Sequence, residues 1–315
     1  MASRVEVIVN SQARRLGESS ALRRALVSAF EESGATVHAT ATLEELQAVA
    51  NGIASREVDV VVLAGGDGAT MRGVSALALA YEGRKLPRVA LISAGTVGTI
   101  ARNTGARGAS RRTALRLAVA LGEGRVAERV QATLRVRDDR GGDRVGFIFG
   151  AGLVSRFFEL YDASRHRGHL HAAQIAARLF VGSLCGSALA ERVLERQAGS
   201  LRVDEKAEVE TSWSLILASV LPNVGLHLYA AYRARECPPR FHVVASGLGA
   251  NALGRQMPRV LMGMPIRGKP GVDTLALSVD FTFGEDGSAY VLDGDVLHAK
   301  AVHLSPGPAL TMVTI

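Results

Sequence analysis

The run Val58–Leu63 constrains the fold most, because it opens directly into a glycine turn that a helix-period segment follows. An almost continuously apolar strand of this kind is typical of a parallel sheet that helices cover on both faces. Further strand candidates in the first third of the chain are Val5–Val9, Ala35–Ala39 and Arg88–Ile92. Helix-period segments alternate with them at residues 22–30, 43–50, 74–81 and 111–121. The alternation predicts a Rossmann-like, doubly wound α/β domain over residues 1–130.

The pattern changes after about Gln131 to short segments of alternating polar and apolar residues. These segments are Ala132–Arg137, Arg144–Phe149, Phe241–Ala245, Thr274–Phe283 and Ala289–Leu292. We expect helical stretches at His171–Glu195 and Asn251–Met262 between them. Residues 131–300 are therefore predicted to form a β-rich, antiparallel, sandwich-like second domain, and the tail at about 300–315 is expected to return to the first.

Charge and cysteine content indicate the kind of partner and compartment. Lys and Arg number 37 against 30 Asp and Glu, so the net charge of +7 favours anionic partners. Cys185 and Cys237 are too few for a disulfide framework. The chain starts without a leader-like apolar segment, and polar residues interrupt Ala172–Ala190 and Trp213–Tyr229. We expect a cytoplasmic protein in which both stretches are core elements.

Two glycine turns follow neighbouring strands of the predicted first domain. One is Gly65-Gly66-Asp67-Gly68, and the other begins at Gly95-Thr96. Glycines at the carboxyl ends of parallel strands let the backbone approach a phosphate, and the helix start that comes next adds positive potential. Ordinary tight turns are the alternative for each alone, but the pair favours one nucleotide-binding cradle.

The order of motifs resembles the catalytic domain shared by diacylglycerol kinases, sphingosine and ceramide kinases and their bacterial lipid-kinase relatives. The matching segments are Asn10–Arg14, Gly65–Ala69, Gly95–Arg102 and Asp293–Asp295. The resemblance implies an ATP-dependent kinase that phosphorylates a lipid hydroxyl, most simply that of diacylglycerol, with Mg²⁺ bound alongside ATP. Ceramide and sphingoid bases remain open as acceptors.

Carried over to this chain, the resemblance implies two sets of site residues. Those implied to bind ATP are Asn10, Ser11, Arg14, Thr42, Gly65, Gly66, Asp67, Gly68, Ala69, Gly95 and Thr96. Asp67 would face the Mg²⁺-bound phosphates. Asp295 is implied to be the base that accepts the hydroxyl proton, with Asp293 as its supporting acid. The alternative for Asp293-Gly294-Asp295 is a hairpin turn, which Asp-Gly encodes well.

Several positions depart from the family pattern. Ala69 stands where Thr is usual, Arg72 where Glu is common, and Val97 and Gly98 where Gly and Asn are frequent. The segment that aligns with a structural magnesium site contains Pro238 and Pro239, so we expect that metal to be absent, although Glu236 is an alternative ligand. These departures motivate a second class of function, a catalytically weakened nucleotide- or lipid-binding protein.

Partners are inferred from the same interpretation. We expect a lipid acceptor at an anionic membrane surface, where basic residues such as Arg165, Arg167 and Arg178 hold the protein peripherally, and we leave a homodimer open. A kinase of a soluble acceptor is an alternative, because NAD kinases share the Gly-Gly-Asp-Gly turn. We expect no nucleic-acid partner, since no aromatic and basic motif supports one. His166, His169 and His171 lack the companions of a metal site and are interpreted as a solvated loop.

Overall fold

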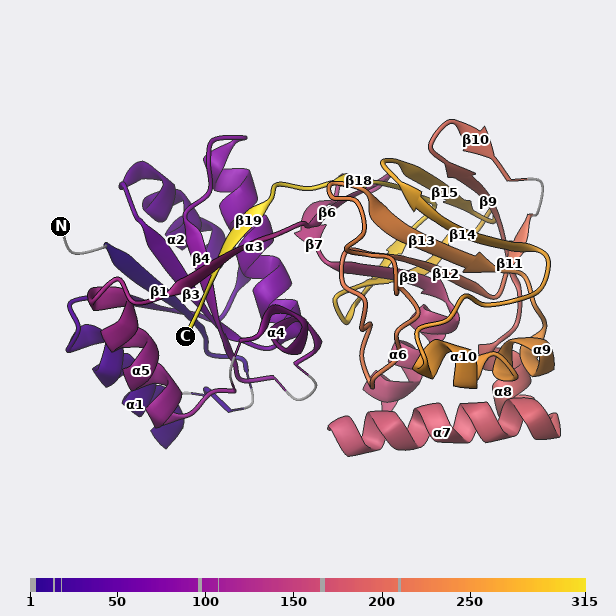
Figure 1. The fold of residues 1–315 in the computed structure, drawn as a ribbon, viewed down its shortest axis with the longest axis horizontal. Helices are drawn as coiled ribbons and strands as arrows, with labels where there is room; N and C mark the ends of the chain where they lie inside the picture. The colour runs from indigo at the N-terminus through magenta and orange to yellow at the C-terminus, as the bar shows by residue number, and fades with distance from the viewer. Residues whose placement is uncertain are drawn as a thin grey trace. The chain divides into compact units, whose positions relative to one another are not determined.

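The computed structural model describes residues 4–13, 15–17, 19–95, 98–106, 108–164, 168–208 and 211–315. The chain divides into two compact units (Figure 1). The first unit comprises residues 1–133 and 308–315, and the second unit comprises residues 134–307.

A six-stranded sheet in the order β2-β1-β3-β4-β19-β5 forms the centre of the first unit. Its strands are β1 (Val5–Asn10), β2 (Thr36–Thr40), β3 (Val60–Gly65), β4 (Arg88–Ser93), β5 (Ala127–Gln131) and β19 (Leu310–Thr314). All neighbours pair in parallel except β5, which is antiparallel to β19. Every residue of β3 is buried, as the continuous apolar run predicts.

Helices cover both faces of this sheet (Figure 1). They are α1 (Ala21–Glu31), α2 (Leu43–Ser55), α3 (Asp67–Tyr81), α4 (Thr99–Thr104) and α5 (Arg111–Gly122). α1 packs with α5 and α2 packs with α3, and apolar residues such as Leu26, Phe30 and Leu117 meet the strands in one core. The predicted doubly wound α/β fold is confirmed.

The second unit contains two antiparallel sheets (Figure 1). The first sheet has the strand order β10-β9-β15-β18-β6-β7, and β11 also pairs with β9. Its strands are β6 (Leu134–Asp138), β7 (Asp143–Gly146), β9 (Gln197–Val203), β10 (Lys206–Ala207), β11 (Ser212–Trp213), β15 (Val279–Phe283) and β18 (Ala301–Pro306). The second sheet has the strand order β14-β13-β12-β8-β16-β17. Its strands are β8 (Ile148–Gly152), β12 (Leu215–Ser219), β13 (Phe241–Ser246), β14 (Gly271–Ala276), β16 (Ser288–Leu292) and β17 (Asp295–Ala299). The predicted β-rich, antiparallel second region is confirmed.

Helices gather beside the second of these sheets (Figure 1). They are α6 (Leu153–Ala163), α7 (His169–Cys185), α8 (Ala188–Val193), α9 (Ala250–Gly254) and α10 (Met257–Leu261). The predicted helix His171–Glu195 is wrong as a single element, because Gly186 adopts a left-handed conformation that ends α7. No helix among the described residues is long and apolar enough to cross a membrane.

Two predicted strands are also wrong as single elements, because the chain changes sheet within them. Thr274–Phe283 divides into β14 and β15, and Arg144–Phe149 divides into β7 and β8. Neither corner contains a proline or a charged residue that would mark a break in the strand, so the sequence pattern did not reveal them. At each corner an aspartate carboxylate from a neighbouring hairpin accepts two successive backbone amides.

Candidate functional site

The two glycine turns of the first unit touch each other. A Cβ atom added at Gly95 would lie 2.6 Å from the Cα atom of Gly66, and one added at Gly66 would lie 3.2 Å from the Cα atom of Gly95. The amide of Ala94 donates to the carbonyl oxygen of Gly65 at 2.7 Å. Residues with side chains would force the ends of β3 and β4 apart, so glycine at these positions has a steric cause.

The helix α3 begins at this junction with its first amide groups unsatisfied. Gly66, the N-cap residue of α3, has no side chain that could accept a hydrogen bond from the helix, and no described residue accepts one from the amides of Asp67, Gly68 or Ala69. Such a helix start carries partial positive charge and outward-pointing N–H groups, which suit an anion such as a phosphate. The starts of α1, α2 and α5 are instead capped by the side chains of Ser20, Thr42 and Ser110.

The start of α4 is occupied by a carboxylate of the protein itself. Oδ2 and Oδ1 of Asp67 accept hydrogen bonds from the amides of Thr99 and Ile100 at 2.7 and 3.1 Å. Burial raises the pKa of Asp67, while the two amide bonds and the charge of Arg102 act against that rise. Of the two described helix starts at these turns, that of α3 therefore has amide groups free to bind an anion, whereas that of α4 donates to Asp67.

Asp67 is also the residue predicted to face Mg²⁺-bound phosphates. Each of its oxygens accepts one amide and keeps further lone pairs, so this role stays a prediction. Within the described part of the chain, no group of three or more His, Cys, Asp or Glu side chains is placed to hold a metal ion. One carboxylate together with substrate phosphates fits Mg²⁺, which seldom uses an all-protein cage.

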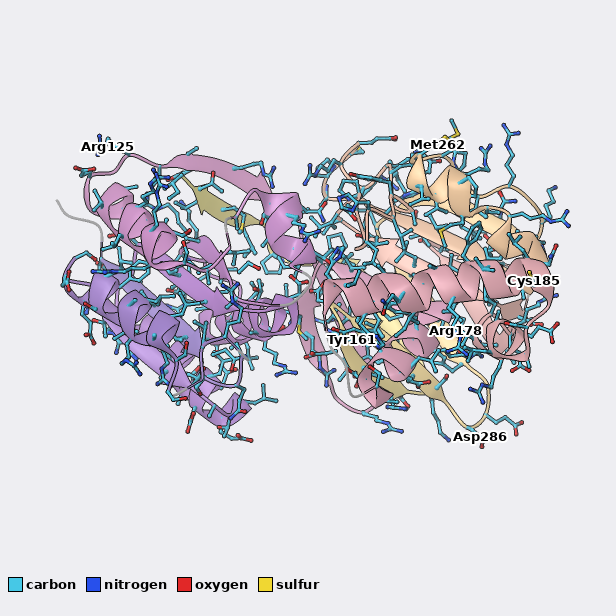
Figure 2. The ribbon with its side chains drawn as sticks, turned by 90° about the horizontal axis from the view of Figure 1, so that it is seen from below. Arg125, Tyr161, Arg178, Cys185, Met262 and Asp286 are labelled. Atoms are coloured by element: carbon cyan, nitrogen blue, oxygen red, sulfur yellow. The ribbon has the colours of Figure 1, made fainter. Side chains whose placement is uncertain are left out.

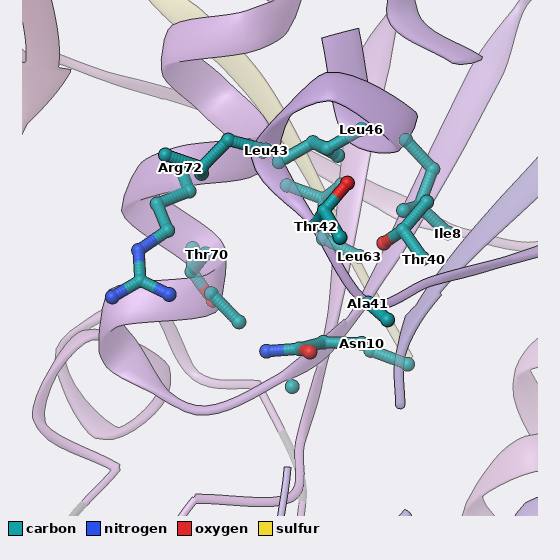
Figure 3. Close-up of a pocket in the computed structure, with 14 residues that line it drawn as sticks. Ile8, Asn10, Thr40, Ala41, Thr42, Leu43, Leu46, Leu63, Thr70 and Arg72 are labelled. Carbon is teal, nitrogen blue, oxygen red and sulfur yellow. The ribbon is translucent and has the colours of Figure 1, made fainter. Parts of the chain in front are cut away.

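A pocket lies beside the start of α3, at the carboxyl ends of β1, β2 and β3 (Figure 3). It encloses a cavity of about 70 Å³. Of the predicted ATP-binding residues, Asn10, Thr42, Gly65 and Ala69 line it. The amide group of Asn10 points toward α3, which carries Arg72 on the same pocket wall (Figure 3). A cavity of this size is several-fold smaller than a whole small-molecule site.

Two residues of the predicted ATP site, Ser11 and Thr42, fix the local structure after β1 and β2. Oγ of Ser11 donates to the carbonyl oxygen of Thr40 at 2.9 Å, which joins the end of β1 to the end of β2. Thr42 accepts from the amide of Glu45 at 3.2 Å and begins α2 with a reciprocal capping box. Arg14, Thr96, Arg165, His166 and Arg167 lie outside the described residues.

The predicted catalytic motif forms the hairpin turn between β16 and β17 in the second unit. Asp293 and Gly294 both have positive φ, 50° and 95°, and Leu292 pairs with Asp295 across the turn. The carboxylate of Asp293 is buried and accepts from the amides of Phe147 and Ile148, each at 2.9 Å. Asp293 therefore fixes the position of Asp295, which begins β17 and is partly buried.

A second hairpin of the same unit repeats this arrangement. Asp204 follows β9, has a φ of 51°, and accepts from the amides of Leu277 and Ser278 at 2.8 and 3.0 Å. Its amide donates to Ser278, as the amide of Asp293 donates to Ile148. An aspartate of this kind is thus a structural clamp of the sandwich, and only the Asp293 hairpin continues into the residue predicted as the base.

The segment that aligns with the family's structural magnesium site has other contacts. Glu236, the alternative ligand, pairs with Arg233 at 2.9 Å. Further on, His242 of β13 contacts Asp273 of β14 at 2.9 Å, and the hydroxyl group of Tyr232 donates to the same carboxylate. The absence of this metal stays a prediction.

Sequence reasoning missed several residues around the site. Thr40, Leu43 and Leu46 line the pocket, and their signal is their place at the end of β2 and the start of α2. The helix α6 beside the Asp293 hairpin was also not predicted; a Cβ atom at Gly294 would lie 3.4 Å from its Phe158. Apolar residues at Leu153, Phe157 and Tyr161 recur at a spacing of four, which could have revealed it.

Known proteins resemble this chain in sequence over one segment and in fold over its length. Residues 4–131 match the family of the diacylglycerol kinase catalytic domain. No curated protein matches the chain. A structure from Bacillus anthracis, described as "a putative diacylglycerol kinase", has a TM-score of 0.69 and 15% identity, covering 99% of this chain and 95% of the other.

A second Bacillus anthracis structure, described as a diacylglycerol kinase, has a TM-score of 0.64 and 12% identity, covering 99% of this chain and 97% of the other. At such identities the likeness shows the fold. The match of residues 4–131, which contain both glycine turns and the uncapped start of α3, shows the family. This segment of the chain belongs to the diacylglycerol kinase catalytic domain family.

Proposed function

We propose that the protein is an ATP-dependent lipid kinase that transfers the γ-phosphate of ATP to a hydroxyl group of diacylglycerol. The observation that carries the proposal is the uncapped start of α3 beside the pocket, at the junction of two glycine turns. Backbone amides and a helix start are the groups that hold nucleotide phosphates in many folds. The family of residues 4–131 supplies the reaction class, and diacylglycerol is its named acceptor.

In this proposal the residues of the chain have separate roles. The amides of Asp67, Gly68 and Ala69 would stabilise the negative charge of the phosphates, and Asn10 and Thr42 would contact the rest of the nucleotide. Mg²⁺ held by the phosphates, with Asp67 as its protein carboxylate, would add charge neutralisation.

The transfer itself needs one proton acceptor. The acceptor hydroxyl oxygen forms a bond to the γ-phosphorus, the bond from that phosphorus to the bridging oxygen breaks, and ADP leaves with the bonding electrons. Asp295 would take the hydroxyl proton, and the clamp formed by Asp293 would hold Asp295 in place.

The test is transfer of labelled γ-phosphate from ATP, with Mg²⁺, to mixed micelles of diacylglycerol, ceramide, sphingosine or monoacylglycerol. Labelled phosphatidic acid from the diacylglycerol micelles is the expected product. Labelled product from ceramide or sphingosine alone would show that diacylglycerol is the wrong acceptor, while the proposed lipid-kinase reaction would stand. ATP binding without any labelled lipid would instead support the nucleotide- or lipid-binding protein.

Gly95→Ala tests the phosphate cradle. The added methyl group would lie 2.6 Å from Gly66, so the turns must separate, and we expect ATP affinity to fall about tenfold. Gly122→Ala is the matched control, because a Cβ atom there meets nothing within 4 Å. Calorimetric titration with ATP measures both variants, and equal affinities would contradict the cradle.

A further inference from the structure

The helix α7 has an unusually apolar exposed face. Between its ends, the side chains that face solvent are Leu170, Gln174, Ala177, Arg178, Val181 and Leu184. Leu170 is 73% exposed, Val181 56% and Leu184 42%. The helix has 17 residues and contains no acidic residue, whereas the solvent face of a helix usually carries charges of both signs. Figure 2 shows α7 with Arg178 along one side of the second unit.

This face cannot be hidden by a small rotation of the helix. The opposite side of α7 is buried through Ala172, Leu179 and Gly182. The side-chain amide of Asn251, on α9, donates to the carbonyl oxygens of Ser183 and Leu184 at 3.1 and 3.3 Å. An apolar surface held outward in this way indicates an interaction site.

A second exposed apolar segment begins at the last residue of α10 in the same helical layer. Leu261 is 49% exposed, Met262 61% and Met264 42%. The amide of Tyr229 donates to the carbonyl oxygen of Val260 at 3.1 Å, which ties α10 to the body of the unit. Flexible methionine side chains adapt well to a soft, irregular partner.

Charge identifies the partner of these surfaces. The chain has no acidic residue from position 163 to 190, which includes α7, nor from 237 to 272, which includes α10. Basic residues in the described parts of these segments include Arg178, Arg255, Arg259, Arg267 and Lys269. Acidic residues lie on the neighbouring helices α6 and α8, and a Cβ atom at Gly186 would be 3.8 Å from Oε1 of Glu191. An apolar exposed face whose own helix carries a basic and no acidic residue is the pattern of a helix that lies in the headgroup region of an anionic membrane.

We propose that the outer face of α7, together with Leu261–Met264, docks the second unit on an anionic lipid bilayer. Leu170, Val181 and Leu184 would enter the apolar region, while Arg178 reaches the phosphates of the headgroups. A second copy of the chain docked symmetrically through the same face would bring the two Arg178 side chains together. Their like charges would repel, which disfavours a dimer through this face. The choice of lipid rests on the proposed lipid-kinase function.

Sedimentation with vesicles tests the proposal on the full chain, without ATP. The vesicles contain phosphatidylglycerol and phosphatidylcholine in equal parts, or phosphatidylcholine alone. We expect binding to the anionic vesicles, and a loss of about tenfold or more in Val181→Asp and in Arg178→Glu. Val119→Asp and Arg116→Glu are matched controls at exposed positions of α5, where Val119 is 52% exposed, and are expected to bind as the wild type does.

Circular dichroism of each variant separates a docking defect from unfolding. Absence of wild-type binding to anionic vesicles, or equal binding by the α7 variants, would overturn the proposal. So would a wild-type dimer in light scattering that Val181→Asp dissociates without any vesicle binding. Phosphorylation of a short-chain, water-dispersed diacylglycerol is measured in parallel. A protein that phosphorylates this substrate but does not bind vesicles would contradict the docking surface and leave the proposed kinase function standing.

Discussion

Two hairpins of the second unit are built alike and differ in the residue that begins the strand after the turn. Asp204 and Asp293 each take the first turn position with positive φ, and each clamps two amides where the chain changes sheet. Across the turns, Val203 pairs with Lys206 and Leu292 pairs with Asp295. One hairpin therefore presents a cation where the other presents a carboxylate.

The difference separates the structural role of the clamping aspartate from the predicted catalytic role of Asp295 within one motif. The clamp recurs away from the predicted site, so the amide contacts of Asp293 need no catalytic explanation. Asp295 has no such counterpart, since Lys206 stands in its place in the other hairpin. Changes at the clamps should thus alter stability, whereas a change at Asp295 should alter turnover.

The largest expected effect is that of Asp295→Ala. Loss of the proposed proton acceptor should lower kcat about 10²- to 10⁴-fold, while ATP affinity stays near that of the wild type. Lys206→Ala, at the equivalent position of the other hairpin, should leave kcat unchanged. Steady-state transfer of labelled phosphate measures both, and an equal kcat for Asp295→Ala and the wild type would remove Asp295 as the base.

Asp293→Ala is expected to lower the free energy of unfolding by about 2–4 kcal/mol, because the amides of buried Phe147 and of Ile148 lose their acceptor. Asp204→Ala should cost about 1 kcal/mol, since this side chain is 43% exposed and water can replace it. Urea unfolding measures the two variants. Equal costs would break the proposed distinction between a buried and an exposed clamp.

A smaller effect concerns Asp138, whose carboxylate contacts β16, the strand before the Asp293 turn. Tyr290 of β16 and Arg144 both donate to Oδ2 of Asp138 at 2.7 Å. Burial raises the pKa of Asp138, but the hydrogen bonds from Tyr290, the Gly142 amide and Arg144 outweigh it, and the net shift is downward.

Because the folded pKa of Asp138 is lowered, its stabilisation is present above the ordinary Asp pKa and is lost as pH falls through the folded value. Asp138→Asn should therefore cost about 1–2 kcal/mol near pH 7, and this difference should shrink at about pH 3. Thermal unfolding of both proteins at the two pH values checks this. A difference that grows on acidification would contradict the assigned direction.

The fold was largely predictable where a residue pattern is compatible with a single kind of structure. The apolar run before Gly65 predicted a buried parallel strand, and β3 is buried throughout. The corners at Phe147 and Leu277 were not predictable, because neither contains a proline or a charged residue that would mark the change of sheet. Aspartates more than seventy residues away hold these corners, and a local pattern contains no such information.

The candidate site was predicted in its parts but not in its contacts. The sequence places glycines after β3 and β4, but it does not show that Gly66 and Gly95 touch. It suggested Asp67 for a metal, whereas the structure adds its bonds to Thr99 and Ile100. Only the three-dimensional arrangement distinguishes the free helix start from the one that Asp67 occupies.

The central claim is that nucleotide phosphates bind the free amides at the start of α3. Amide hydrogen exchange, followed by NMR with and without Mg²⁺ and ADP, tests it directly. We predict that the amides of Gly68 and Ala69 gain protection on binding, whereas those of Thr99 and Ile100, which already donate to Asp67, change little. Saturating ADP that leaves Gly68 and Ala69 exchanging as fast as before would contradict the claim.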